Sequence, residues 1–162
     1  MLKNVATLSD PLVLVTPYTI RAKILLQTMW TRGLDWDECI GGDLTEQVQQ
    51  CFSEQDDLKK IQVHRCLQPI TGPAETTIHT FVDASRDAFA AVSYVRNTRL
   101  DGVVKTRFIA SKTKVLPLAT MSIPRLEQSV AVMGLTLARS VSKFLQMAIG
   151  CAIFWSDSTN TL

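Results

Sequence analysis

The sequence predicts an α/β fold in which a mixed sheet forms in the order β-β-β-α-β. The first observation is three runs of alternating apolar and polar residues, at 76–83, 89–96 and 103–113, separated by short turns. Such alternation indicates strands, because successive strand side chains point to opposite faces. The second is a stretch, 122–146, with apolar residues at helical spacing. The third is an apolar run after this helix, 148–156, which predicts a fourth strand.

A small, mainly helical segment is predicted before this region. Pro17 favours a helix start, the residues through Trp30 suit a helix, and Gly33 stands where such a helix ends. The residues expected on its buried side are Ile20, Ile24 and either Leu25 or Met29.

A second helix is predicted to begin at Asp43, which has capping-box spacing to Glu46. After it, residues 61–67 alternate like a short strand. The apolar stripe expected for the second helix consists of Leu44, Val48, Cys51 and Phe52.

The Pro- and Gly-rich stretch 68–75 predicts a domain boundary. We therefore divide the chain into a segment 1–72 and a domain 73–162. The two parts differ in charge, with 7 Lys/Arg and 9 Asp/Glu in the first and 10 and 6 in the second. The basic character of the second part suits a polyanionic partner.

The composition is that of a globular protein, with 46% hydrophobic and 20% charged residues. The 4 cysteines form no C-x-x-C motif, so we expect free thiols in a reducing compartment. Residues 1–10 lack the apolar core of a signal peptide, and the apolar run 144–155 is too short to cross a membrane. These features predict a cytoplasmic protein with no membrane partner.

The long helix 122–146 has a recognisable start and a predicted core face. Ser122 is a candidate N-cap, and Pro124 belongs in a first turn. Small residues at 131, 134 and 138 would let the helix lie close to the sheet. The expected core face consists of Leu126, Val130, Met133, Leu137, Val141 and Phe144.

Three carboxylates occupy matching places in this order of elements. Asp83 follows the apolar part of the first strand, Glu127 is expected in the first turn of the long helix, and Asp157 follows the fourth strand. A right-handed crossover can place the first and fourth strands side by side and parallel, so that their carboxyl ends open into one crevice. A helix packed across the sheet can direct Glu127 to the same place.

A cluster of three carboxylates is a candidate metal site, because the carboxylates repel one another unless a cation holds them. Mg²⁺ and Mn²⁺ prefer oxygen ligands, and two such ions about 4 Å apart activate water for phosphodiester hydrolysis. Asp83, Glu127 and Asp157 are therefore the candidate catalytic and metal-binding residues. The basic residues expected to contact phosphates are Arg86, Lys105, Arg107, Lys112, Lys114 and Arg125.

Each carboxylate also has a structural interpretation. Asp83 and Asp157 lie in cap-like sequences, and Glu127 suits the start of a helix dipole. Other enzyme classes fit less well: Ser85 stands where exonuclease sites need a second acid, and there is no D-[ST]-G protease motif. His79 is expected on the same face of the predicted strand as Asp83, but a structural role at the sheet edge or in the core is the simpler interpretation.

Five short strings occur in a characteristic order along the chain. "ATLSDPLVLVTPYTIRAKILLQTMW" and "GLDWDE" resemble the segment after the reverse-transcriptase palm in the polyprotein of BEL/Pao-type LTR retrotransposons. "HTFVDAS", "IPRLE" and "FWSDST" resemble the ribonuclease H region that follows it. The region also carries the label "Pao retrotransposon peptidase", but no protease motif here supports that name.

The resemblance implies a partial ribonuclease H-like fold for residues 73–162 and a reverse-transcriptase thumb or connection segment for residues 1–72. It also implies that Asp83, Glu127 and Asp157 match three acidic metal ligands of ribonuclease H, which cleaves RNA in RNA–DNA hybrids with two Mg²⁺ or Mn²⁺ ions. The fourth acid of that family normally lies well after Asp157. We therefore expect a fragment of a longer pol polyprotein, with weak or no activity by itself.

The alternative hypothesis is a non-catalytic connection module that binds hybrid backbone or a partner subunit. In that case the three acids serve as caps, and no metal affinity depends on them.

Overall fold

The computed structural model describes residues 10, 13–35, 37–63, 66–67, 74–119 and 121–158. These residues form two compact units, each with its own hydrophobic core. The first unit contains the helices that precede Gln62, and the second contains the sheet and the long helix. The predicted boundary at 72/73 stays a prediction, because residues 68–73 lie outside the described residues.

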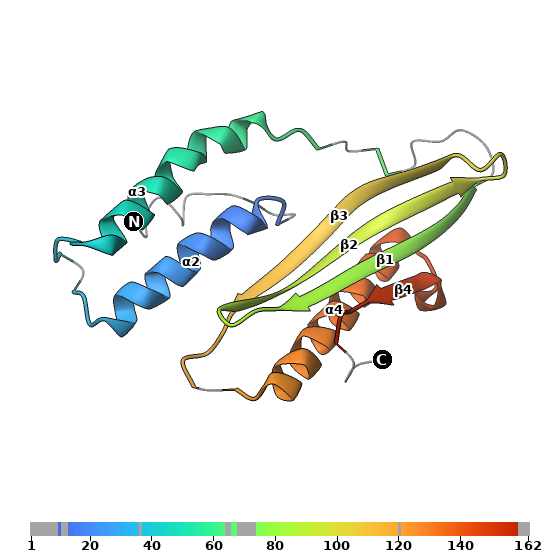
Figure 1. Cartoon of the computed structure of the whole chain (residues 1–162). Coiled ribbons are helices and arrows are strands. Elements are labelled where there is room, and N and C mark those ends of the chain that lie inside the picture. Colours follow the sequence, from blue (N-terminus) through green and yellow to red (C-terminus); the bar gives the residue numbers. More distant parts are fainter. Residues whose placement is uncertain are drawn as a thin grey trace. The chain divides into compact units, whose positions relative to one another are not determined.

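The first unit is helical (Figure 1). Helix α2 (Thr16–Thr31) has Pro17 in its first turn and is followed by Gly33 with φ 72°, as the sequence predicts. Helix α3 (Asp43–Ser53) continues directly into the 3-10 helix η1 (Glu54–Lys60).

The predicted cap of α3 is wrong. Gly42 is the N-cap residue, and Asp43 is already helical and forms no side-chain cap. The Asp43 carboxylate instead accepts two hydrogen bonds from the Arg32 guanidinium, at 2.9 and 3.0 Å. This contact lowers the pKa of Asp43, mainly through the hydrogen bond from Arg32.

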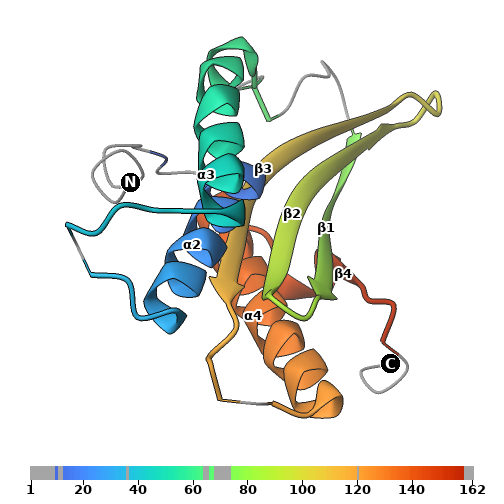
Figure 2. The same ribbon diagram turned by 60° about the vertical axis from the view of Figure 1, so that its left-hand side comes forward.

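The core of the first unit lies between α2 and α3, which run side by side (Figure 2). The predicted α2 face is displaced, because Tyr18 and Ala22 are buried whereas Ile20 and Ile24 are only half-buried. The α3 stripe is confirmed at Leu44 and Cys51, whereas Val48 and Phe52 are half-buried. The buried residues of this core are Tyr18, Ala22, Leu25, Leu44 and Cys51.

The strand predicted at 61–67 is not formed by the residues of that stretch that the structure describes. Residues 61–63 and 66–67 have no strand assignment, and 64 and 65 lie outside the described residues. Alternation over so few residues is a weak signal without a partner strand to pair with.

The second unit contains a four-stranded mixed sheet with the strand order β3-β2-β1-β4. β1 (Ala74–Ala84), β2 (Ala88–Arg99) and β3 (Val104–Val115) form an antiparallel meander. β4 (Ala152–Trp155) pairs with β1 in parallel. The predicted α/β class and the β-β-β-α-β order are therefore confirmed.

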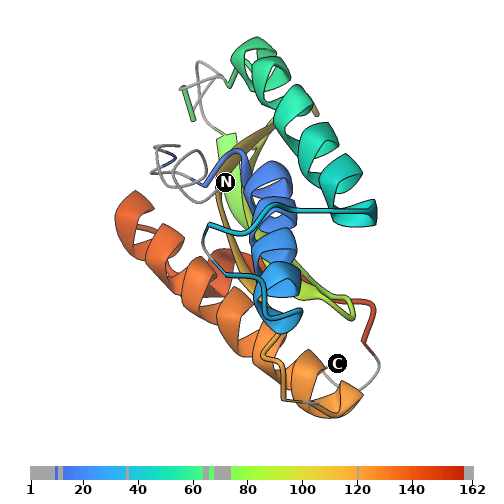
Figure 3. The ribbon, with the colours of Figure 1, turned by 90° about the vertical axis from the view of Figure 1, so that its left-hand side faces the viewer.

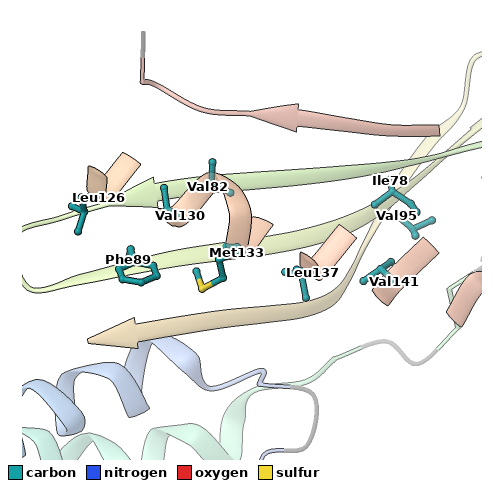
Figure 4. Close-up of a cluster of buried hydrophobic side chains, with 10 residues drawn as sticks. Ile78, Val82, Phe89, Val95, Leu126, Val130, Met133, Leu137 and Val141 are labelled. Carbon is teal, nitrogen blue, oxygen red and sulfur yellow. The ribbon is translucent and has the colours of Figure 1, made fainter. Parts of the chain in front are cut away.

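Helix α4 (Ile123–Leu145) connects β3 to β4, with the short 3-10 helix η2 (Ile149–Cys151) before β4. It packs along one face of the sheet (Figure 3). Figure 4 shows Leu126 near the end of β1 and Val141 near its beginning, so α4 runs antiparallel to β1. The N-terminal end of α4 therefore lies at the carboxyl ends of β1 and β4.

The predicted core face of α4 is confirmed from Leu126 to Val141, but the prediction that Phe144 belongs to this face is wrong. The Phe144 side chain is 75% exposed, and Leu145 packs against the core in its place. Ser122 is the N-cap residue but makes no side-chain cap hydrogen bond. None of the described helices combines the length and apolarity needed to cross a bilayer.

Candidate active site

The pairing of β4 with β1 brings Asp83 and Asp157 to the same end of the sheet. In the parallel register, Phe81 lies opposite Trp155, the last residue of β4. Asp83 and Asp157 each follow these partners by two residues. Both are exposed, and neither forms an ion pair with another described residue.

Asp83 lies on the face of the sheet opposite to α4. Its neighbour Val82 is buried on the α4 side, where it contacts Gly134. Because strand side chains alternate between faces, Asp83 shares the open face with His79 and Phe81.

Glu127 approaches from the other side of the sheet. It is the fifth residue of α4, so the expectation that it lies in the first turn is wrong. Glu127, Ala131 and Gly134 share one stripe of the helix. Since Gly134 lies against β1, this stripe follows β1, and Glu127 lies near the N-terminal end of α4, where β1 and β4 finish.

The structure thus brings the three predicted acids to one end of the sheet but not into one cluster. Across the described part of the chain, no group of three or more His, Cys, Asp or Glu side chains is placed to hold a metal ion. The reason is the alternation of the strand, which directs Asp83 away from the face that carries α4 and Glu127.

Two of the basic residues predicted to contact phosphate lie on β3 at the same end as Asp83. Asp83 pairs with Ala90, which pairs with Thr113, so Lys112 and Lys114 flank the same cross-strand row. β3 is separated from β1 by two strand spacings, about 10 Å. Both lysines are exposed.

The remaining basic residues divide between the two ends of the sheet. Arg86 lies in the turn after β1, and Arg125 lies in the first turn of α4, so both are near the acids. Lys105 and Arg107 are at the far end of β3. Arg107 is half-buried, and its Nη1 donates to the Thr106 carbonyl at 3.3 Å.

Sequence reasoning missed a row of aromatic side chains that crosses the open face of all four strands. Neighbouring rings lie 5.8 to 5.9 Å apart between centroids. The sequence did contain a sign of this row, because aromatic residues recur at alternate positions of the strands. Only the register of the strands shows which rings contact one another. In order of ring contact, the row consists of Phe108, Tyr94, Phe81, Trp155 and His79.

His79 is the basic member of this row. Its Nδ1 accepts a hydrogen bond from Trp155 Nε1 at 3.0 Å, and its Nε2 lies 3.1 Å from Thr77 Oγ1. Burial, and to a lesser extent the positive charge of Arg96, lower the pKa of His79 below its ordinary value. Both effects favour the neutral imidazole.

A mixed sheet in this order, with a long helix on one face, is the architecture of a partial ribonuclease H-like fold. More particularly, the chain belongs to the family described as the Pao retrotransposon-like RNaseH-like domain, whose model matches residues 1–158. A comparison with curated proteins finds no match. The family match confirms the resemblance to a Pao-type retrotransposon RNase H-like region, whereas the reverse-transcriptase segment predicted for residues 1–72 stays a prediction.

Proposed function

We propose that this domain cleaves the RNA strand of RNA–DNA hybrids in a reaction that depends on Mg²⁺ or Mn²⁺. The observation that supports this most directly is the parallel pairing of β4 with β1, which brings Asp83 and Asp157 together at the strand ends. The carboxyl ends of parallel strands are the usual location of sites in α/β sheets.

The donor set suits hard cations, because carboxylate oxygens are the ligands that Mg²⁺ and Mn²⁺ prefer. Asp83 and Asp157 would hold the metal ions at the strand ends, and Glu127 would bind one ion from the start of α4 and help to position the water. When bound, the metal supplies an activated water and stabilises the leaving oxygen.

The proposed substrate is the hybrid backbone, and the proposed protein partner is the rest of a pol polyprotein with its reverse transcriptase. Lys112, Lys114, Arg86 and Arg125 lie at the end of the sheet that carries the acids, and all four are exposed. We assign them to phosphate contacts that position the RNA strand near the carboxylates. Cytoplasmic action is part of the same proposal.

The decisive experiment measures Mn²⁺ binding by the 162-residue chain, whose own cleavage of hybrids is expected to be weak or absent. We expect Asp83→Asn and Asp157→Asn each to weaken Mn²⁺ binding by about tenfold or more, since even indirect changes to metal sites cost this much. Asp87→Asn is the matched control, because Asp87 is an exposed acid in the turn after β1. Equal Mn²⁺ affinity in all three variants and the wild type would contradict the proposal.

A second candidate function is binding of hybrid without cleavage. It is favoured by one observation: Asp83 lies on the face of the sheet opposite to the helix that carries Glu127. If this is the function, Asp83→Asn retains full hybrid affinity, added metal has no effect, and affinity falls with salt through phosphate contacts alone.

A further inference from the structure

We propose that His79 and Trp155 form a latch that holds the end of β4 against β1 and so positions Asp157 beside Asp83. The latch itself is a structural claim, and its consequence for the acids rests on the proposed function. In this reading the two residues are positioning residues, because neither would touch metal or substrate.

The latch joins two strands through side chains alone. Trp155 Nε1 on β4 donates to His79 Nδ1 on β1 at 3.0 Å, and the two ring planes differ by only 17°. Phe81 supports the same indole, with ring centroids 5.8 Å apart and planes 9° apart. Trp155 is therefore held at two points of β1, one polar and one apolar.

Apart from the latch, the contacts that hold β4 to other described residues are its backbone pairing with β1 and the packing of Ala152 against the core. The strand is four residues long and pairs with β1 along one edge. Its side chains remain substantially exposed, at 42% for Ile153, 42% for Phe154 and 48% for Trp155. Because nearly half of each of these side chains remains exposed, contacts made by the Trp155 ring contribute substantially to the attachment of β4.

The latch determines the position of Asp157 because Asp157 lies only two residues after Trp155 in the sequence. Asp157 follows Trp155 by two residues, and Asp83 follows Phe81 by two residues. Trp155 and Phe81 are partners in the register, so they are the last paired positions before the acids. If the end of β4 separates from β1, Asp157 loses its fixed distance from Asp83.

The hydrogen bond also requires one charge state of His79. The indole N–H is only a donor, so His79 Nδ1 must be unprotonated, and Nε2 then donates to Thr77 Oγ1. Protonated His79 has two N–H donors and cannot accept from Trp155. The hydrogen bond of the latch therefore forms when His79 is neutral and is lost when His79 is protonated.

The surroundings of His79 determine where this change occurs. Arg96 and Tyr94 of β2 share its face of the sheet, and β4 contributes no titratable group within its strand. Glu75 and Asp83 are the acids of its own strand at the same parity. Of these groups, Arg96 acts on His79 and disfavours protonation.

The first test follows the indole N–H of Trp155 in ¹H–¹⁵N spectra across pH 5 to 8, assigned among the 3 tryptophans with Trp155→Phe. We expect its resonance to shift with a midpoint below 6.5 in the wild type and to lose that midpoint in His79→Phe. Amides of residues 153–155 should exchange about 3- to 10-fold faster in Trp155→Phe and His79→Phe, the effect of one lost hydrogen bond.

Two variants control for general effects of substitution. Tyr94→Phe removes a polar group from the same aromatic row, and Trp30→Phe replaces a tryptophan of α2 that is 75% exposed. Both should leave exchange in β4 unchanged. A Trp155 resonance that ignores pH, together with wild-type exchange in Trp155→Phe, would overturn the latch.

The second test separates the latch from the proposed function. Trp155→Phe should weaken Mn²⁺ binding about 3- to 10-fold, and wild-type affinity should fall with the same midpoint as the indole resonance. A midpoint that is absent from His79→Phe identifies His79 as the group that titrates. Unchanged Mn²⁺ affinity would overturn the positioning role. If the wild type binds no Mn²⁺, both the proposed function and the positioning role fail. The NMR spectra and the amide exchange of the first test still show whether the contact between His79 and Trp155 holds β4.

Discussion

Gly134 is the residue at which α4 makes its closest approach to the sheet. A Cβ atom there would overlap Val82 Cγ1 and lie 3.7 Å from Thr80 Cγ2, on the two buried β1 positions below the helix. The absence of a side chain therefore allows the helix to lie directly on β1. Ala138, fully buried one turn further along, continues the same small stripe.

We predict that Gly134→Ala destabilises the second unit by about 1–3 kcal/mol, the usual cost of overpacking. The sign is informative, because in an exposed helix the same change stabilises by about 1 kcal/mol. Urea unfolding followed by circular dichroism measures the difference.

Gly150→Ala serves as the control, because a Cβ at Gly150 meets no atom within 4 Å. It should change stability by less than about 0.5 kcal/mol. A stabilising effect of Gly134→Ala would show that α4 does not lie as close to β1 as described.

At the scale of elements, β3 is an edge strand of the described sheet that carries four cations along one side. Lys105, Arg107, Lys112 and Lys114 pair with buried residues of β2, so all four have the parity of the α4-facing side. Their positions along the strand differ, and this separates the end near the acids from the far end.

We predict that Lys112→Ala with Lys114→Ala weakens hybrid binding and lowers the slope of log affinity against log salt by about 1 to 2, since each lost phosphate contact removes about one released counterion. Fluorescence anisotropy with a labelled hybrid at several salt concentrations measures this slope.

Lys105→Ala is the matched control on the same strand, at the end remote from the acids. It should leave the salt slope close to that of the wild type. An equal effect of Lys105→Ala would mean that the hybrid lies along the whole of β3 and does not lie only near Asp83.

At the scale of the whole molecule, pH acts on the two units through different groups. In the first unit, hydrogen bonds from Arg32 and Lys59 lower the pKa of Asp43 and Asp56, so their contribution is present above the ordinary carboxyl range and is lost in acid. In the second unit, burial lowers the pKa of His79. Its contribution is complete above about pH 6.5 and is lost as pH falls through the lowered value.

We predict that the melting temperature of the wild type falls between pH 7 and pH 5.5, and that this fall is smaller in His79→Phe. The carboxylates do not interfere, because their stabilisation is lost only at lower pH. Thermal unfolding at pH 7.0, 6.0 and 5.5 measures the effect. An identical pH dependence in the two proteins would assign the change to other groups.

Local patterns determined much of this protein from sequence alone. The alternation of β1 to β3, the spacing of Leu126 to Val141 and the position of Pro17 each reflect the geometry of one element, so no partner was needed to interpret them. The order β-β-β-α-β followed, and with it the parallel pairing that brings Asp83 and Asp157 to one end of the sheet.

Only the tertiary structure decided the features that depend on a second element. Phe144 is exposed because the packed stripe of α4 passes through Leu145, and Glu127 lies across the sheet from Asp83 because α4 covers the Val82 face. The contact between His79 and Trp155 depends on the register of β4 against β1. Periodicity describes one element at a time, whereas register and the covered face arise only when elements pack.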